Sequence, residues 1–311
     1  MSEPQTADAV LLVRPAAFGF HAEAAASNAF ASVSADAGVR AHAIRESERL
    51  ARALDAAGVE VRVLDDLAEP DKPDAVFPNN WVSFHADGTM VLYPMATAAR
   101  RLERDTHRLE SLLAGFAVRR TVDLSRHEHE GRFLEGTGSL ILDRPRRRAF
   151  ASHSPRTDPA VIAEFDQALG YSTTLFDAAD ANGRPVYHTN VLLSLGTRFA
   201  MLCGEAVPEA QRSGLIESLG RTVIDVGFDQ MRQFACNLIE LRSRAGDPVI
   251  AMSVAALNAL RPDQRRTLEG FGSLVAVPIP TIEAVGGGSV RCMIADIHLP
   301  RKPVAVANPA P

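Results

Sequence analysis

A cysteine near the end of the chain has neighbours that suit nucleophilic chemistry. Cys292 follows Arg291 and a run of three glycines at 286–288. An arginine beside a thiol favours the thiolate, which is the form of cysteine that attacks. Glycines let backbone approach a ligand closely, and the apolar alternation at 293–299 predicts a strand with Cys292 at its entrance. The segment predicts a nucleophile; a buried structural cysteine beside a loop is the alternative.

Four earlier segments also open an apolar, strand-like run with a small or polar residue. The five openings, at positions 80, 135, 190, 237 and 292, lie 55, 55, 47 and 55 residues apart. A recurrence near 50 residues is what a repeat architecture closed on itself would give. In a radial arrangement the openings converge on one central cavity. The residues brought together there would be Asn80, Glu135, His188, Asn190 and Cys292.

Apolar periodicity and punctuation predict the elements between these openings. Residues 21–57 are alanine-rich with scattered charges and predict a helix that ends near Gly58, with a strand at 59–64 after it. Further helices are predicted at 97–114, 161–169, 209–219 and 253–260. Because no Ser/Gly linker or long charge run divides the chain, we expect one domain over 1–311, frayed at about 1–9 and 301–311.

Composition narrows the class of protein and its partners. With 46% hydrophobic and 23% charged residues, the chain is typical of a soluble globular protein. A net charge of −5 gives no electrostatic reason to expect nucleic acid or an anionic membrane surface. No stretch approaches 18 uninterrupted apolar residues, and the first residues do not resemble a signal peptide. We therefore expect a cytoplasmic protein that needs no membrane; a homo-oligomer is compatible with the sequence.

The sequence indicates no cofactor and no metal. Three scattered cysteines, Cys203, Cys236 and Cys292, form neither a disulfide framework nor a metal-binding spacing. The glycine run precedes a strand, which is the wrong context for a dinucleotide or phosphate loop. His127-Glu128-His129 invites a metal interpretation, but it lies in a charged stretch without a matching partner, so we interpret it as a loop near the mouth of the site.

Five ordered motifs between about residues 10 and 300 resemble the guanidino-group-modifying superfamily, the arginine deiminase and amidinotransferase fold. Among its branches the chain is most similar to the citrulline hydrolases (citrulline ureidases). The motifs are Val13-Arg14-Pro15 with Phe18-Gly19-Phe20, Phe77-Pro78-Asn79-Asn80-Trp81, Leu134-Glu135-Gly136-Thr137-Gly138-Ser139, Tyr187-His188-Thr189-Asn190, and Arg291-Cys292-Met293 after the glycines. The resemblance implies a five-bladed, pseudo-symmetric α/β propeller, the pentein fold.

The same resemblance implies a catalytic role for each of three residues. Cys292 would attack the central carbon of a guanidinium or ureido group, His188 would be general acid and base, and Glu135 would orient the histidine or the substrate. The chemistry agrees, since a departing amine must be protonated and histidine suits proton transfer in both directions. A paired glutamate would also favour the imidazolium. Alone, His188 could equally be a core histidine, and Glu135 a turn residue.

Two asparagines and one arginine bear on the substrate. The resemblance places Asn80 and Asn190 where arginine deiminases hold the guanidinium with aspartates. An amide offers one acceptor and two donors, so it serves both sides of a neutral ureido group and supplies no charge for a guanidinium. Arg291 is a candidate for binding substrate carboxylate or raising the thiolate fraction; a structural salt bridge is its alternative.

These residues predict a cysteine-dependent hydrolase of a small amino-acid substrate. The favoured reaction converts citrulline to ornithine, ammonia and carbon dioxide through a carbamoyl group on Cys292. The enzyme alternatives are an arginine deiminase, a dimethylarginine hydrolase or an amidinotransferase. A non-enzymatic binding protein, like the ribosome anti-association factor with a similar propeller, is the alternative of another class.

Overall fold

The computed structural model describes residues 3–303, and the extreme ends that we expected to fray lie outside them. Within the described part, residues 3–9 are held against the fold. Glu3 is buried and its carboxylate accepts a hydrogen bond from Arg144 at 2.8 Å. At the other end, Arg301 donates to Glu60 at 2.7 Å. Residues 3–9 and 301–303 therefore pack against the fold, and the rest of the expected frayed ends lies outside the described residues.

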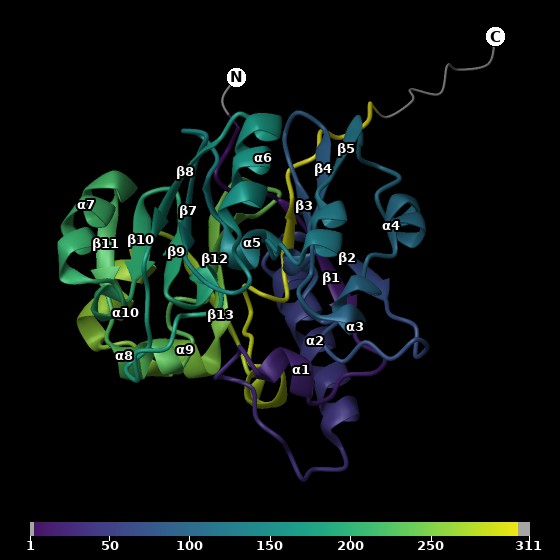
Figure 1. The fold of residues 1–311 in the computed structure, drawn as a ribbon, viewed down its shortest axis with the longest axis horizontal. Coiled ribbons are helices and arrows are strands. Elements are labelled where there is room, and N and C mark those ends of the chain that lie inside the picture. The colour runs from purple at the N-terminus through teal and green to yellow at the C-terminus, as the bar shows by residue number, and fades with distance from the viewer. Residues whose placement is uncertain (1–2, 304–311) are drawn as a thin grey trace.

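Five small sheets of three strands make up the fold (Figure 1). In each sheet the first strand pairs antiparallel with the second, which pairs parallel with the third. The sheets are β3 (Val82–Phe84), β4 (Thr89–Leu92), β5 (Arg120–Asp123); β6 (Ile141–Asp143), β7 (Arg148–Ser152), β8 (Ser172–Phe176); β9 (Leu193–Leu195), β10 (Phe199–Leu202), β11 (Thr222–Asp225); β12 (Ile239–Arg242), β13 (Pro248–Ser253), β14 (Ser273–Val277); and β15 (Ala295–Ile297), β1 (Ala9–Arg14), β2 (Glu60–Asp65). The repeated topology confirms the predicted five-bladed α/β propeller.

The last blade combines both ends of the chain. Strand β15 pairs antiparallel with β1, which places Ala9 opposite Ile297. The first strand of each blade follows, within a few residues, one of the five openings recognised in the sequence. The openings therefore share one structural position, repeated around the ring.

Most of the predicted helices are present in the described part of the chain. The helices are α1 (Ala22–Ala25), α2 (Val39–Ala56), α3 (Ala98–Arg101), α4 (Thr106–Leu112), α5 (Gly136–Ser139), α6 (Pro159–Leu169), α7 (Glu209–Leu219), α8 (Phe228–Arg232), α9 (Val254–Ala259) and α10 (Pro262–Glu269). None of the helices within residues 3–303 is both long and apolar enough to cross a membrane.

Two predicted helices are interrupted. The prediction at 21–57 was wrong for 26–38, where the chain leaves the helix between α1 and α2. That stretch is rich in Ser, Asn and Asp, whose side chains compete for backbone groups: Asn28 accepts from the Phe30 N–H and Asp36 from the Gly38 N–H. The helix at 97–114 is divided because Asp105 caps α4 by accepting from the Arg108 N–H.

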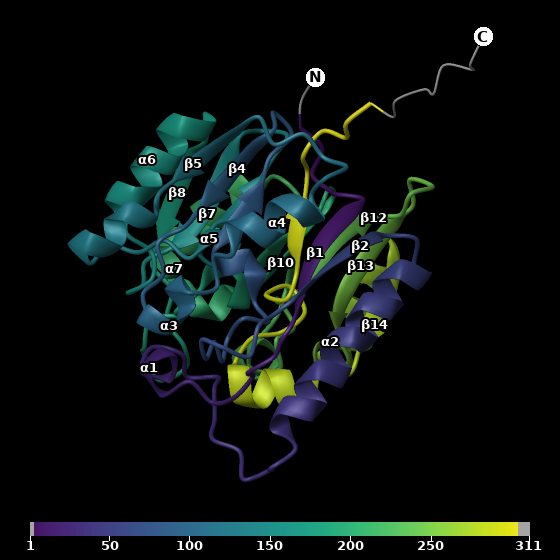
Figure 2. The ribbon, with the colours of Figure 1, turned by 90° about the vertical axis from the view of Figure 1, so that its right-hand side faces the viewer.

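The long helix α2 ties the closing blade to its neighbour. It packs across β1, β2 and β14, and Figure 2 shows it lying along these strands. Leu50 and Leu54 on its inner face are fully buried in an apolar cluster that also contains Cys292. The packing of α2 therefore supports the part of the core on which the cysteine rests.

Truncation of this inner face should destabilise the whole domain. Leu50→Ala is expected to lower the free energy of unfolding by about 2–5 kcal/mol, because it leaves a cavity in a closed core. Leu67, half exposed in a loop, is the matched control, and Leu67→Ala should stay within about 0.5 kcal/mol of the parent. Urea denaturation of both variants measures the difference; equal midpoints would contradict this view of the core.

Candidate active site

The turns that precede the first strands converge on one buried region. Asn80 ends the 3₁₀ turn Pro78–Asn80, Asn190 lies in the turn Thr189–Val191, and Glu135 caps α5. Helix α5 contacts both of those turns. Asn80, Glu135, His188, Asn190, Asn237 and Cys292 are each at most 2% exposed. Residues more than 200 positions apart in sequence therefore share one enclosed site.

His188 and Glu135 form the central pair. Nε2 of the imidazole lies 2.8 Å from Oε2 of the carboxylate, which fixes the ring and leaves Nδ1 for proton transfer. The glutamate has further donors: the Ala96 N–H at 3.1 Å on Oε1, and Arg156 Nη1 at 3.1 Å on Oε2. The guanidinium of Arg100 lies 3.7 Å from the same Oε2. Both oxygens of this buried carboxylate thus accept hydrogen bonds.

These neighbours determine the protonation states. Burial alone would raise the pKa of Glu135, but Arg156, His188 and Arg100 outweigh it and hold that pKa well below its usual range. For His188 the balance is the opposite. Burial, supported by Arg156 and Arg100, lowers its pKa to about 4 although Glu135 acts to raise it. Glu135 does favour the imidazolium, as expected, but burial and the two arginines outweigh it, so the neutral ring is the favoured form at pH 7.

Cys292 lies in the turn 290–293, ahead of β15 and not at the strand entrance. Its Sγ is 3.4 Å from Nδ2 of Asn190 and 3.3 Å from Nδ2 of Asn237. The predicted nucleophile therefore has two amide groups against its sulfur. Asn237 opens the fourth blade, so the recurrence identified its position, but its contact with the cysteine was missed because the resemblance gave this asparagine no role.

Arg291 has its guanidinium engaged elsewhere. Nη1 donates to the Ile294 carbonyl at 2.7 Å, and Nη2 lies 3.3 Å from Oδ1 of Asp296. This is the structural salt bridge that the sequence analysis kept as an alternative. A role of Arg291 in binding substrate gains no contact in support.

Asn80 has a cation on its oxygen. Arg100 Nη1 donates to Oδ1 of Asn80 at 2.8 Å, while Nδ2 of Asn80 donates to Oδ1 of Asn79 at 2.9 Å. Arg100 is itself held by Glu103, through Nε at 3.0 Å and Nη2 at 3.1 Å. Sequence reasoning missed both Arg100 and Arg156, because an arginine in a charged stretch is ordinarily a solvated side chain.

Two glycines of the Glu-Gly-Thr-Gly motif make room for the site. Gly136 has φ +46°, and a Cβ built there would lie 2.3 Å from the Asn79 carbonyl oxygen. A Cβ at Gly138 would lie 2.5 Å from Nδ2 of Asn80 and 2.8 Å from Nδ1 of His188. The asparagine amide and the imidazole therefore both pack directly against the Gly138 backbone, which requires glycine there.

Residues 22–38, here called the cover segment, close the site from outside. Arg156 Nη2 donates to the Ala24 carbonyl and to Ser27, at 2.6 and 2.8 Å. Asn28 donates to the Gly287 carbonyl at 3.1 Å, and Ser32 to the Ala284 carbonyl at 2.7 Å. These hydrogen bonds join the segment to Arg156 and to residues 284–287 ahead of Cys292, which is itself nearly inaccessible.

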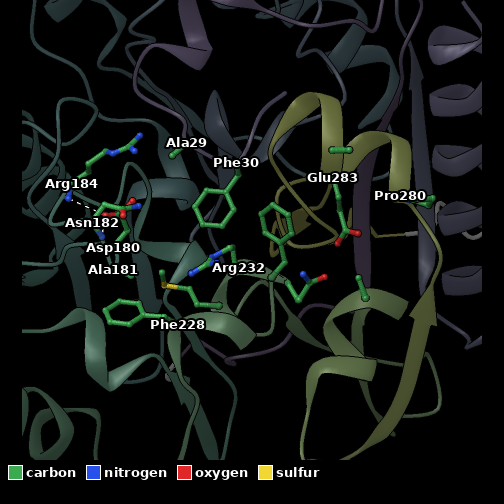
Figure 3. A pocket seen from close by; sticks show the side chains of 15 residues that line it. Ala29, Phe30, Asp180, Ala181, Asn182, Arg184, Phe228, Arg232, Pro280 and Glu283 are labelled. Carbon is green, nitrogen blue, oxygen red and sulfur yellow. Dashed lines mark hydrogen bonds between the residues drawn. The ribbon is translucent and has the colours of Figure 1, made fainter. Parts of the chain in front are cut away.

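A cavity of about 650 Å³ lies beside the cover segment (Figure 3). Phe30 forms part of its wall, with its ring 5.1 Å from that of Phe234 and 6.2 Å from that of Tyr187. Arg184, Arg232 and Glu283 also line it, whereas Cys292 and His188 do not. A second cavity of about 310 Å³ shares Phe30 and reaches Tyr187. Phe30 thus stands between two hollows outside the buried residues.

The histidines at 127 and 129 lie outside this region. The segment forms a 3₁₀ turn, Ser125–Glu130, in which His127 contacts Glu164 at 2.8 Å and Glu128 accepts from Arg104 at 2.6 Å. Both groups are therefore engaged in local pairs. No cluster of metal-ligating side chains occurs among residues 3–303.

Comparisons with known proteins agree with this fold. The family model for N,N dimethylarginine dimethylhydrolase, eukaryotic, matches residues 14–299. The chain belongs to this family. It is therefore a hydrolase of carbon–nitrogen bonds other than peptide bonds, and a member of the superfamily that its motifs resemble. No curated protein sequence matches it significantly.

Solved structures share the fold at low sequence identity. The arginine dihydrolase ArgZ from the cyanobacterial ornithine–ammonia cycle has a TM-score of 0.74 at 16% identity; the match covers 95% of this chain and 41% of ArgZ. Its N-terminal domain, as a cysteine-to-serine variant bound to substrate, matches at 0.74 and 15%, covering 94% and 98%. A dimethylarginine dimethylaminohydrolase variant with S-methyl-L-thiocitrulline matches at 0.64 and 15%, covering 95% and 99%. The chain spans under half of full-length ArgZ.

Filling the space at Gly138 should abolish activity without unfolding the domain. Gly138→Ala forces the Asn80 amide or the His188 ring to move, and a misplacement near 1 Å can cost about 10²-fold in rate. Gly214→Ala in α7 meets nothing within 4 Å and should leave activity unchanged. Steady-state hydrolase assays and circular dichroism compare the two variants. Full activity in Gly138→Ala would contradict the geometry described.

The low pKa of His188 predicts an unusual acid limb. A base with a pKa of about 4 stays neutral from pH 7 down to about 5, so kcat/KM should be level there and fall tenfold per pH unit below about 4.

Since the folded chain binds this proton more weakly than an ordinary histidine, stability present above pH 6.5 is lost as the pH falls towards 4. A pH–rate profile with circular dichroism at each point tests this; a limb near pH 6.5 would argue against it.

Proposed function

We propose that the chain hydrolyses citrulline, with Cys292 as nucleophile, His188 as general acid and base, and Glu135 as the group that orients the imidazole. The products are ornithine, ammonia and carbon dioxide. Family membership supports hydrolysis at a guanidino-type carbon, and the hydrogen-bonding capacity of the buried site supports the ureido form of that carbon.

The observation that carries this proposal is the set of hydrogen-bond donors and acceptors that the buried asparagines leave unpaired. Arg100 occupies the oxygen of Asn80 and one N–H of Asn80 goes to Asn79, so this side chain has a single N–H left for a ligand. Asn190 donates to the sulfur, and its Oδ1 is buried without a partner among the described residues. Nδ2 of Asn79 is also a buried donor without a partner there. Unpaired donors together with an unpaired acceptor match a ureido group, which has a carbonyl oxygen and N–H groups.

A guanidinium would be poorly served by the same groups. It has only N–H donors and carries a positive charge, so it needs a carboxylate with free lone pairs. Glu135 has both oxygens engaged, and Arg100 and Arg156 already provide positive charge beside it. Enclosing a further unpaired cation costs on the order of several kcal/mol. The resting site therefore favours a neutral substrate.

The reaction follows from the protonation states. Neutral His188 accepts the thiol proton as Sγ of Cys292 forms a bond to the ureido carbon, and N–H donors hold the developing oxyanion. The imidazolium returns that proton to the δ-nitrogen, the carbon–nitrogen bond breaks, and ornithine leaves a carbamoyl thioester. His188 then takes a proton from water as the water attacks the thioester carbon. Sγ departs, and the released carbamate breaks down to ammonia and carbon dioxide.

Arginine dihydrolysis is a second candidate, favoured by the structural similarity to ArgZ. Hydrolysis of the arginine guanidinium carbon first yields a ureido group, and hydrolysis of that group yields ornithine. The two candidates therefore share their last step. They differ in whether the site also accepts the cationic substrate.

Parallel assays with citrulline, arginine and dimethylarginine test the proposal. We expect ornithine and ammonia from citrulline and little turnover of the two cationic compounds. Ornithine from both citrulline and arginine would establish the dihydrolase instead. Citrulline accumulating from arginine would overturn the argument from the asparagines and leave a deiminase.

Two substitutions separate the roles of the nucleophile and the amide. Cys292→Ala should reduce turnover at least ~10³-fold, whereas Cys203→Ala, in the core, should not. Asn190→Asp keeps the shape but removes the donor, and should lower kcat/KM for citrulline about 10²-fold while improving binding of arginine. Initial rates and arginine inhibition constants decide. Unchanged preference in Asn190→Asp would exclude Asn190 from substrate selection.

A further inference from the structure

The sulfur of Cys292 is held by amide groups and not by a cation. The Nδ2 atoms of Asn190 and Asn237 lie 3.4 and 3.3 Å from Sγ, close enough for N–H to sulfur hydrogen bonds. The guanidinium next in sequence, that of Arg291, is directed to Asp296 and the Ile294 carbonyl. A buried thiolate needs donors to replace water, and these two amides are the side chains placed to supply them.

Backbone groups fix the orientation of the Asn237 amide. Its Oδ1 accepts the N–H of Arg291 at 3.1 Å, and its Nδ2 donates to the Asn190 carbonyl at 3.0 Å. If Oδ1 and Nδ2 of Asn237 were exchanged, the amide NH2 would face the N–H of Arg291 and the amide oxygen would face the Asn190 carbonyl, so neither hydrogen bond could form. Since Nδ2 carries two hydrogens and one goes to the carbonyl, the other is left for Sγ. The donor is therefore aimed at the sulfur by the backbone of two blades.

We propose that Asn237 is a catalytic residue, which together with Asn190 stabilises the negatively charged form of the Cys292 sulfur. The inference rests on the proposed function only in taking Cys292 as its nucleophile. Hydrogen bonds donated to a charged group favour that group over its protonated form. Asn237 makes no other use of this N–H, and its remaining contacts hold it in position.

The same donors act at two stages of the reaction. Before attack they raise the fraction of sulfur present as thiolate. When water has added to the carbamoyl thioester, the carbon–sulfur bond breaks and its electron pair returns to Sγ, where the amides stabilise the leaving group. A change at Asn237 should therefore slow release of the carbamoyl group as well as its formation.

The test is an ultraviolet titration of the thiolate in the full-length protein, with each variant measured against its own Cys292→Ser counterpart. Asn237→Ala removes one of two donors and should raise the midpoint by about one pH unit, a tenfold loss of thiolate at a given pH. Asn237→Asp keeps the shape but places a carboxylate at the sulfur, so its midpoint should rise further. Cys236→Ala disturbs the same turn without touching Sγ and should leave the midpoint unchanged.

The order of the midpoints decides between a donor and a structural role. The proposal is supported if the titration midpoint is lowest in the parent and Cys236→Ala, higher in Asn237→Ala and highest in Asn237→Asp. Equal midpoints in the parent and Asn237→Asp overturn it, as does a shift in Cys236→Ala as large as that in Asn237→Ala. If Asn237→Ala does not fold, Asn237→Asp alone decides. The titration is run without substrate, so its outcome does not depend on which compound the enzyme hydrolyses. A protein that fails to hydrolyse citrulline would refute the proposed function but would not change the order of the midpoints.

Discussion

The site depends on one buried carboxylate. Glu135 accepts hydrogen bonds from His188, Arg156 and the Ala96 N–H, with Arg100 close by. Through these partners it orients the base, links three neighbouring segments of the ring, and reaches the cover segment by way of Arg156. Removing one partner of such a network leaves charges buried and unpaired, which is more costly than never having buried them. The glutamate is thus an element of the fold as well as of the chemistry.

The charged side chains of the site lie in one hydrogen-bonded network, apart from the groups that contact the sulfur of Cys292. The arginines and Glu135 compensate each other, while the side chains in contact with the sulfur of Cys292 are the amides of Asn190 and Asn237. Amides bind strongly only where donors and acceptors are matched. Selectivity in such a site therefore arises from hydrogen-bond pattern and shape, with little long-range attraction for ions.

The five-fold repeat could be predicted from the sequence, but the buried charged residues of the site could not. A recurrence of openings near every 50 residues predicts convergence, because the first strand of each blade starts from the same place in the ring. Arg100 and Arg156 could not be predicted, since each binds a site residue about 20 positions earlier in the chain, Asn80 and Glu135, and no local pattern distinguishes a buried arginine. Arg291 was misleading for a similar reason: adjacency to Cys292 in the chain does not specify where a long side chain points. The prediction of one helix at 21–57 was wrong for residues 26–38, where Ser, Asn and Asp side chains bind nearby backbone groups.

The pairing of β15 with β1 has a consequence for biosynthesis. The blade that carries Cys292 is formed by the last strand of the domain and the first two, so it cannot exist while the ribosome is still adding the preceding blade. Until then the three-residue strand β15 and the turn before it have nothing to pair with, and the thiol is separated from the base by an open ring. The proposed nucleophile is accordingly translated after Glu135 and His188, and it is positioned only when the ring closes.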